Sequence, residues 1–153
     1  MKKTFLFIAA LFLCCSLAAA EGEAGDSAKE YPVEFTYSMT VKSGKGSTGT
    51  DSVPLVAIEE KSDGTADITI PRFFFSEERC IESYVIKGAS IKEGGDGSKG
   101  YSIKNYSVKS GDKDITVYSL DGTVDKDGNL LMTLVFKAGK MPFKVTAKYS
   151  SLK

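Results

Sequence analysis

The chain has 153 residues, enough for one domain, and its 26% charged and 42% hydrophobic residues are typical of a globular protein rather than a disordered one. Lysine plus arginine and aspartate plus glutamate total 20 each, so the sequence has no excess of positive charge for a nucleic-acid surface. It contains no histidine, which excludes Ser-His-Asp and Cys-His catalytic devices and makes a zinc or copper site unusual.

The first twenty residues have the three parts of a secretory signal peptide. Lys2 and Lys3 form a basic start, residues 4–17 are an almost unbroken apolar run, and residues 18–20 are alanines suited to cleavage. The run is too short for a good membrane span, so no transmembrane span is expected. Cleavage after residue 20 removes two lysines and leaves 18 cations against 20 anions. The sequence therefore predicts an exported protein, periplasmic or secreted.

The three cysteines bear on how the chain is processed and held together. Cys14 and Cys15 leave open a second route, in which a lipidated cysteine becomes the new N-terminus, although Leu13 fits poorly in front of Cys14. After ordinary cleavage Cys80 remains, so no internal disulfide can form and the domain must be held by its core. Cys80 itself is expected to be a small buried hydrophobic residue.

After the signal peptide, residues 21–31 are rich in glycine, alanine and acidic residues and predict a flexible tether before the domain at 32–153. The domain has no convincing helical period. Its segments carry apolar residues at every second position and are separated by turns rich in glycine and aspartate. We expect a bend at Gly88 and a bulge near Asp121 and Gly122. The predicted strands are 33–42, 52–60, 65–75, 80–92, 101–109, 113–124, 130–137 and 143–150.

Eight evenly spaced strands joined by short turns indicate an antiparallel meander. The first and last strands alternate most cleanly, and each places its apolar side chains on one face. Pairing these two strands would close the sheet and remove both exposed edges. We therefore expect an all-β fold, an eight-stranded antiparallel up-and-down β-barrel. Glu82 and Lys87, on opposite faces of the fourth strand, argue against a barrel whose outer face contacts lipid.

Several segments occur in a recognisable order: 35–41 after the signal peptide, 65–75 after an Asp-Gly turn, 81–91, and a closing pair at 134–137 and 143–147. In this order the chain resembles the calycin-like, or lipocalin-like, domains of exported bacterial proteins. The resemblance covers about residues 33–149 and implies an eight-stranded lipocalin-type barrel outside the cytoplasm, with no defined activity. The chain has no tryptophan, so it lacks the Gly-x-Trp of true lipocalins.

No local motif predicts catalytic chemistry. The 44–50 segment has the glycine spacing of a phosphate-binding loop but lacks its lysine and the following helix, so a hairpin loop is expected. The 125–129 turn lacks the closing glutamate of a calcium loop. Glu77, Glu78 and Glu82 are expected on a solvated face rather than as a catalytic carboxylate pair. We therefore expect no catalytic residues, no metal site, no cofactor and no enzymatic activity.

Three consecutive phenylalanines, Phe73, Phe74 and Phe75, are the most informative local feature. In a continuous strand Phe74 would follow Ile70 into the interior, and Phe73 and Phe75 would point outward. Two interpretations stay open. Either a loop or the N-terminal segment covers the outward pair, or the pair forms an exposed aromatic patch for a partner.

Two functional hypotheses follow. In the first, an exported non-enzymatic binding module holds one small apolar molecule inside the barrel, and an interior filled by side chains would count against it. In the second, the barrel is solid, and Phe73 and Phe75 or the loops contact a protein or a glycan at the cell surface or in the periplasm. The residues expected to line the ligand cavity are Tyr37, Met39, Ile70, Phe74, Leu134 and Val145.

Overall fold

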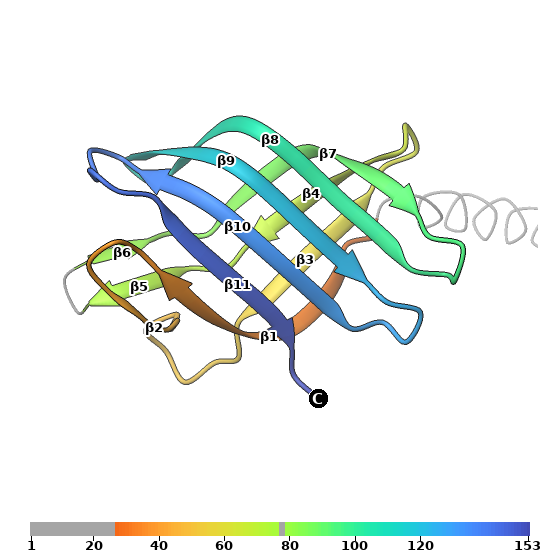
Figure 1. Cartoon of the computed structure of the whole chain (residues 1–153), viewed down its shortest axis with the longest axis horizontal. Helices are drawn as coiled ribbons and strands as arrows, with labels where there is room; N and C mark the ends of the chain where they lie inside the picture. The colour runs from red at the N-terminus through yellow and green to blue at the C-terminus, as the bar shows by residue number, and fades with distance from the viewer. Residues whose placement is uncertain (1–26, 77–78) are drawn as a thin grey trace, which may run out of the picture.

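The structure is a computed structural model that describes residues 27–76 and 79–153. The expected signal peptide, most of the expected tether, Glu77 and Glu78 lie outside the described residues. No helix in the described ranges is long and apolar enough to cross a membrane. The strands, labelled in Figure 1, are β1 (Lys29–Ser38), β2 (Ser43–Lys45), β3 (Leu55–Glu60), β4 (Thr65–Ile70), β5 (Phe73–Ser76), β6 (Arg79–Ile81), β7 (Tyr84–Glu93), β8 (Lys99–Ser110), β9 (Lys113–Val124), β10 (Leu130–Ala138) and β11 (Val145–Ser151).

Eight of the described strands form a closed antiparallel barrel, as the sequence predicts. Their order around the barrel is β1, β3, β4, β7, β8, β9, β10 and β11, and β11 pairs back onto β1. The closing register runs from Val33 opposite Ser151 to Ser38 opposite Thr146, and Figure 1 shows β1 and β11 side by side. The short strand β2 also pairs with β1. Along the chain, β5 and β6 lie between β4 and β7 and form a separate hairpin, while β4 and β7 pair directly with each other. The predicted closure of the first strand on the last is confirmed.

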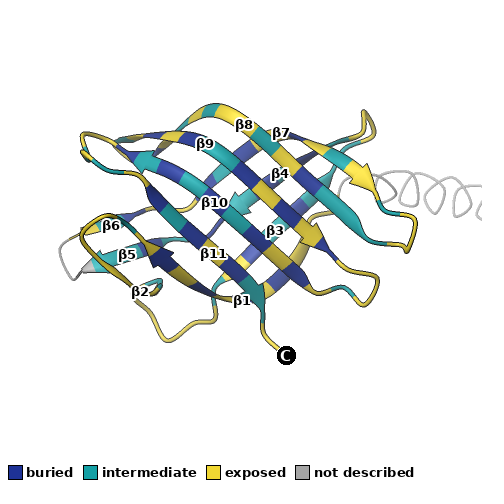
Figure 2. Cartoon of the chain, in the orientation of Figure 1, coloured by how far each residue is buried: buried dark blue, intermediate teal, exposed yellow. Residues whose placement is uncertain are grey.

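Large apolar side chains fill the inward face of the barrel. On β10, Met132, Leu134 and Phe136 are at most 2% exposed, and the residues between them are not buried. The rings of Phe35 and Tyr149 stack with their centres 5.0 Å apart. Figure 2 shows the alternation of buried and exposed positions along the strands. Since each large buried side chain contributes about 1.5–3 kcal/mol, this interior is the main source of stability.

The expected orientation of the phenylalanine run is wrong, because the third predicted strand is broken. β4 ends at Ile70 and β5 begins at Phe73, with a proline and an arginine between them. Pro71 has no N–H to continue the ladder, and the chain restarts after it with the opposite alternation. Phe73 is therefore buried, with 2% of its surface exposed, whereas Phe74 and Phe75 are half-buried.

Phe73 attaches the β5–β6 hairpin to one end of the barrel. Its ring lies edge-on to those of Phe35 and Tyr37, with ring centres 5.4 and 5.2 Å apart. Phe74 lies on the other side of the hairpin, where the Arg72 guanidinium is 4.7 Å from its ring centre. The hairpin thus has one face in the core and one face that the 47–49 loop partly covers, since the Phe74 N–H donates to the Ser47 carbonyl oxygen at 2.7 Å and Gly49 lies against the Phe74 ring.

β7 and β8 pair along part of their length. The ladder joins Ser90–Glu93 of β7 to Lys99–Ser102 of β8, and no pairing of these two strands extends beyond it within the described chain. Gly88 on β7 and Asn105 on β8 both have positive φ, 78° and 55°, which bends the two strands where the pairing stops. The predicted bend at Gly88 is confirmed, and the unpaired stretch lies toward the hairpin end.

One predicted boundary and one predicted bulge position are wrong. β1 begins two residues before Tyr31, which is buried, so the last three residues of the expected tether belong to the barrel. The bulge lies at Tyr118, where the β9–β10 register shifts, and Asp121 and Gly122 pair regularly with β10. At Gly122 a Cβ atom would come within 3.3 Å of the Met132 side chain, so this glycine makes room for a packed neighbour rather than for a bulge.

Candidate binding sites at the two ends of the barrel

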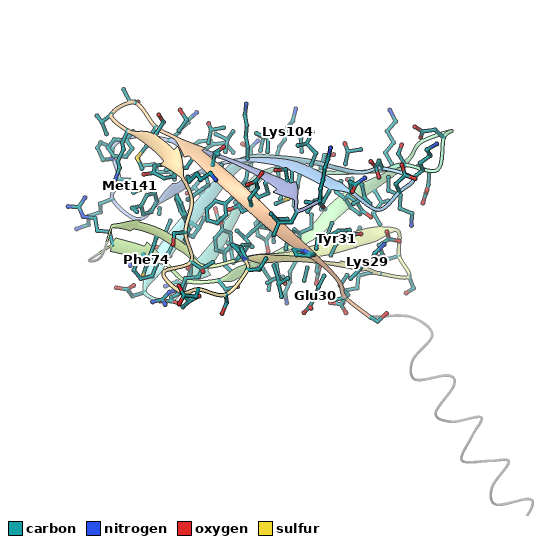
Figure 3. All side chains as sticks on the ribbon, turned by 90° about the horizontal axis from the view of Figure 1, so that it is seen from below. Lys29, Glu30, Tyr31, Phe74, Lys104 and Met141 are labelled. Carbon is teal, nitrogen blue, oxygen red and sulfur yellow. The ribbon has the colours of Figure 1, made fainter. Side chains whose placement is uncertain are left out.

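The connections between strands gather at two opposite ends of the barrel. At one end the β3–β4, β7–β8 and β9–β10 turns meet the start of β1, and at the other lie the β5–β6 hairpin, the β8–β9 turn and the β10–β11 loop. Figure 3 shows Lys29 and Tyr31 toward one end and Phe74 and Met141 toward the opposite end. Each end carries a pocket, and the two pockets share none of the described residues that line them.

We call the pocket at the hairpin end the apolar mouth. Its volume is about 590 Å³, within the ~300–1,000 Å³ range of small-molecule sites. Its apolar walls come from the hairpin on one side and from the β10–β11 loop on the other. The apolar side chains that line it are Phe75, Ile81, Ala138, Met141, Pro142 and Phe143.

Both walls of the apolar mouth are attached to the core. In the β10–β11 loop, Gly139 takes a φ of 52° and its N–H donates to the Asp114 carbonyl oxygen at 2.7 Å. In the hairpin, the Phe75 ring rests on the ring of Phe73, with centres 4.2 Å apart. The mouth is therefore preformed, with few groups to order when a ligand enters.

Positive charge surrounds the apolar mouth. Arg79, Lys113 and Lys140 line it, and no lining residue among those described is acidic. Two carboxylates contact lining residues from outside the pocket: Asp112 Oδ1 lies 3.3 Å from Lys113 Nζ, and Glu82 Oε1, which is paired with Arg72, accepts a hydrogen bond from Cys80 Sγ at 3.5 Å. Cys80, half-buried, also lines the mouth. The arrangement suits an apolar molecule that carries a negative charge.

We call the pocket at the opposite end the polar cup. Its volume is also about 590 Å³. Its floor is formed by Tyr31, Ile58, Tyr101 and Val124, which are all buried. Charged residues, together with Ser27, Gly97 and Gly128, line its walls. The charged wall residues are Lys29, Glu60, Lys99, Asp125, Lys126 and Asp127.

A hydrogen-bonded network joins β3 and β8 across the polar cup. Lys99 Nζ donates to the two carboxylate oxygens of Glu60 at 3.0 and 2.7 Å, and Tyr101 Oη donates to Oε1 at 2.7 Å. The hydrogen bonds from Lys99 and then Tyr101 lower the pKa of the Glu60 carboxyl. Burial, followed by the contact with Glu60, raises the pKa of the Tyr101 phenol. At neutral pH Glu60 is therefore ionised and Tyr101 is neutral.

The rim of the polar cup is built from tight turns. In the β9–β10 turn, the Asp125 carboxylate accepts hydrogen bonds from the backbone N–H groups of Asp127 and Asn129 at 2.9 Å each. It also accepts one from Asn129 Nδ2 at 2.9 Å, and this side-chain bond is the largest cause that lowers the Asp125 pKa. Gly97 and Gly128 have φ of 86° and 85°, which these turns require. The carboxylate of Asp125 thus stabilises the turn.

None of the six residues predicted to line a ligand cavity lines either end pocket. Four of them are packed in the core: Ile70, Leu134 and Val145 are at most 1% exposed, and Tyr37 is 6% exposed. Met39 is half-buried beyond the end of β1, and Phe74 is half-buried on the outer face of the hairpin, between Arg72 and Gly49. The interior positions where a ligand was expected are occupied by side chains that pack against each other.

The two residues of the predicted interaction patch, Phe73 and Phe75, lie in different environments. Phe73 is in the core, so it cannot belong to an exposed aromatic surface. Phe75 is half-buried and lines the apolar mouth.

Sequence reasoning missed the polar cup. Tyr31 was assigned to the tether, and Glu60, Lys99 and Tyr101 lie at the ends of strands that are far apart in the sequence. In an up-and-down barrel, the end of one strand and the start of another meet at the same rim. Following the eight predicted strands around the barrel would have brought these residues together.

The comparisons with known proteins agree with this architecture. The sequence profile of the calycin-like beta-barrel domain matches residues 34–151. A crystal structure from Bacteroides fragilis, provisionally described as an outer membrane protein, matches with a TM-score of 0.68 and 19% identity, which shows the fold alone. The match covers 82% of this chain and 50% of that one, so this chain spans about half the length of that protein. No curated protein matches. The chain belongs to the calycin-like β-barrel domain family.

Proposed function

We propose that this protein is an exported, non-enzymatic binding module that takes one small apolar anion in the apolar mouth. Export is supported by the signal-peptide pattern of residues 1–20 and by the description of the Bacteroides fragilis protein that shares the fold. A non-enzymatic role is supported by the composition of the two pockets, whose described lining residues include no histidine to act as a general base.

The observation that carries the proposal is the pairing of apolar walls with basic groups. Phe75, Met141 and Phe143 present apolar surface at an open pocket, although such surface is uncommon in proteins unless it binds something. Arg79 and Lys140 stand beside it and would attract a carboxylate or sulfonate. The proposed ligand therefore lies at the barrel end and not among the packed interior residues.

The first experiment measures binding of two fluorescent probes to the purified protein. Anilinonaphthalene sulfonate is an apolar anion, and N-phenylnaphthylamine is its neutral counterpart. We expect both to bind, the anion more tightly, with a dissociation constant in the micromolar range of about 1–100 μM.

Matched variants then locate the probe. Phe75→Ser combined with Met141→Ser should weaken both probes at least about tenfold, because the apolar walls are lost. Arg79→Gln combined with Lys140→Gln should weaken the anion and leave the neutral probe unchanged. Leu131→Ser is the control, since Leu131 is 65% exposed on the outer face of β10, away from the mouth.

Circular dichroism melting shows whether each variant is folded. The proposal is wrong if neither probe binds, or if a folded Phe75/Met141 double variant binds both probes as the parent protein does.

The alternative of a solid barrel that contacts a partner protein through Phe73 and Phe75 has less support, because Phe73 is buried.

A further inference from the structure

We propose that the polar cup is a second binding site, for a neutral saccharide. The inference does not depend on the apolar mouth. Within the part of the chain that the structure describes, the two pockets share no lining residue, and the packed interior lies between them.

The walls of the cup carry balanced charge. Three lysines, Lys29, Lys99 and Lys126, face three carboxylates, those of Glu60, Asp125 and Asp127. An ion of either sign would meet repulsion as well as attraction in such a pocket. A neutral ligand avoids this conflict.

Part of this charge is already used within the protein. Glu60, Lys99 and Tyr101 satisfy one another, and Asp125 is hydrogen-bonded within its own turn. These groups already have partners within the protein, so they are not available to bind an ion.

The remaining polar groups offer both donors and acceptors. Among the described residues, no side-chain hydrogen bond or ion pair is made by Tyr31, Lys29, Lys126 or Asp127, although Lys29 Nζ lies 5.4 Å from the ring centre of Tyr31. The two ammonium groups donate, the Asp127 carboxylate accepts, and the tyrosine hydroxyl does both. A sugar hydroxyl also donates and accepts, so a polyhydroxylated ligand matches this set.

The floor of the polar cup offers apolar surface, which a saccharide needs in addition to hydrogen-bonding groups. Tyr31 and Tyr101 are 5% and 3% exposed, and with Ile58 and Val124 they form an apolar base under polar walls. The C–H face of a pyranose ring packs on such a base while its hydroxyls reach outward. The volume of about 590 Å³ is in the range for small-molecule sites.

The experiment is a titration of ¹⁵N-labelled protein followed by two-dimensional NMR. The neutral probes are maltotriose, cellotriose, mannotriose and xylotriose, each at about 10 mM, which would nearly saturate a millimolar site. Glucuronate, phosphate and glycine betaine test an anionic or zwitterionic ligand. We expect at least one trisaccharide to shift the amide signals of Tyr31, Gly97, Lys126 and Gly128 and to leave those of the apolar mouth unchanged.

Two variants test the assignment of groups. Tyr31→Phe removes the free hydroxyl and keeps the ring, and Asp127→Ala removes the free acceptor from an exposed turn position. Each should weaken the best trisaccharide about threefold to tenfold. Lys140→Ala, at the mouth, is the matched control and should change nothing.

The proposal is overturned if no trisaccharide shifts the cup signals, or if an ionic probe binds there more tightly than every trisaccharide. Full affinity in both folded variants would also overturn it.

Discussion

The two ends of the barrel are made by the same strands but closed by different kinds of connection. At the polar cup the connections are tight turns rich in aspartate, glycine and lysine, such as 61–64, 94–98 and 125–129. At the apolar mouth they include, beside the short 111–112 turn, the β5–β6 hairpin that connects β4 to β7 and the 139–144 loop. Strand alternation fixes what lies inside, whereas the connections decide the chemistry of each end.

The two ends also differ in how completely the barrel is paired. β7 and β8 are joined near the cup, from Ser90 to Glu93, and are not paired with each other toward the mouth within the described chain. The mouth therefore lies at the end where β7 and β8 are not paired, and the cup lies at the end where they are paired. Four predictions test the two ends against each other.

The largest effect is expected from Phe73→Ala. Phe73 fastens the hairpin wall of the mouth to the core, so its truncation should lower the free energy of unfolding by about 3–5 kcal/mol, as for other buried phenylalanines. Phe74→Ala, one residue on and half-buried against Gly49 and Arg72, should cost less than Phe73→Ala because its ring is outside the core. Denaturant unfolding of the two variants measures the difference. Equal losses would mean that the reversed alternation after Pro71 is wrong.

At the cup, Glu60→Gln should cost about 0.5–1.5 kcal/mol at pH 7, a charged hydrogen-bond contribution reduced because the Glu60 side chain is 40% exposed. The folded state lowers the pKa of Glu60, so its contribution is present above its unfolded pKa of about 4.3. It is lost as the pH falls through the lower folded value. Unfolding of both proteins from pH 7 to pH 3 should therefore show curves that converge in acid, and a gap that stays constant would contradict the network.

Tyr84→Phe should stabilise the protein by about 0.5–1 kcal/mol. The Tyr84 hydroxyl is buried with no hydrogen-bond partner among the described residues, so removing it removes a desolvation penalty. Tyr31→Phe at the cup should leave stability within about 0.5 kcal/mol, because Tyr31 faces the pocket. Thermal melting compares the two. A loss of stability in Tyr84→Phe would show that the hydroxyl is in fact satisfied.

The smallest expected effect is a difference in amide hydrogen-exchange rate along β8, with no change in stability. Amide hydrogens of β8 beyond Ser102 that point toward β7 lack a strand partner there and should exchange faster than those of Lys99–Ser102. Hydrogen exchange followed by NMR checks this residue by residue. Uniform protection along β8 would mean that the barrel is closed along its whole length.

The barrel could be predicted from the sequence because the alternation of apolar and polar residues is a local pattern that repeats in every strand. Strict alternation in 33–42 and 143–150 was enough to predict that the first strand pairs with the last, and Gly88 marked a true bend. The prediction failed at Phe73, because the chain leaves the ladder at Pro71 and Arg72 and β5 restarts with Phe73, rather than Phe74, facing the core. A Pro-Arg pair in the sequence does not indicate how the strand after it is oriented.

The candidate sites were harder to predict for a different reason. Glu60 and Lys99 meet through topology, 39 residues apart, and neither belongs to a local motif. At the mouth, Phe75 was identified as a candidate contact, but its partners Met141 and Phe143 lie in a loop whose apolar residues could equally have been buried. When a pocket is lined by residues from several separate loops, the sequence around each residue does not show that they will lie together.

The most direct test of the account maps where the anilinonaphthalene sulfonate probe binds, by NMR of the ¹⁵N-labelled protein. The account predicts shifted amide signals at Phe75, Ile81 and Met141, with Gly97 and Gly128 at the cup unchanged. Shifts centred on the interior residues Leu134 and Val145 would contradict it, because they would place the ligand inside a barrel that side chains fill.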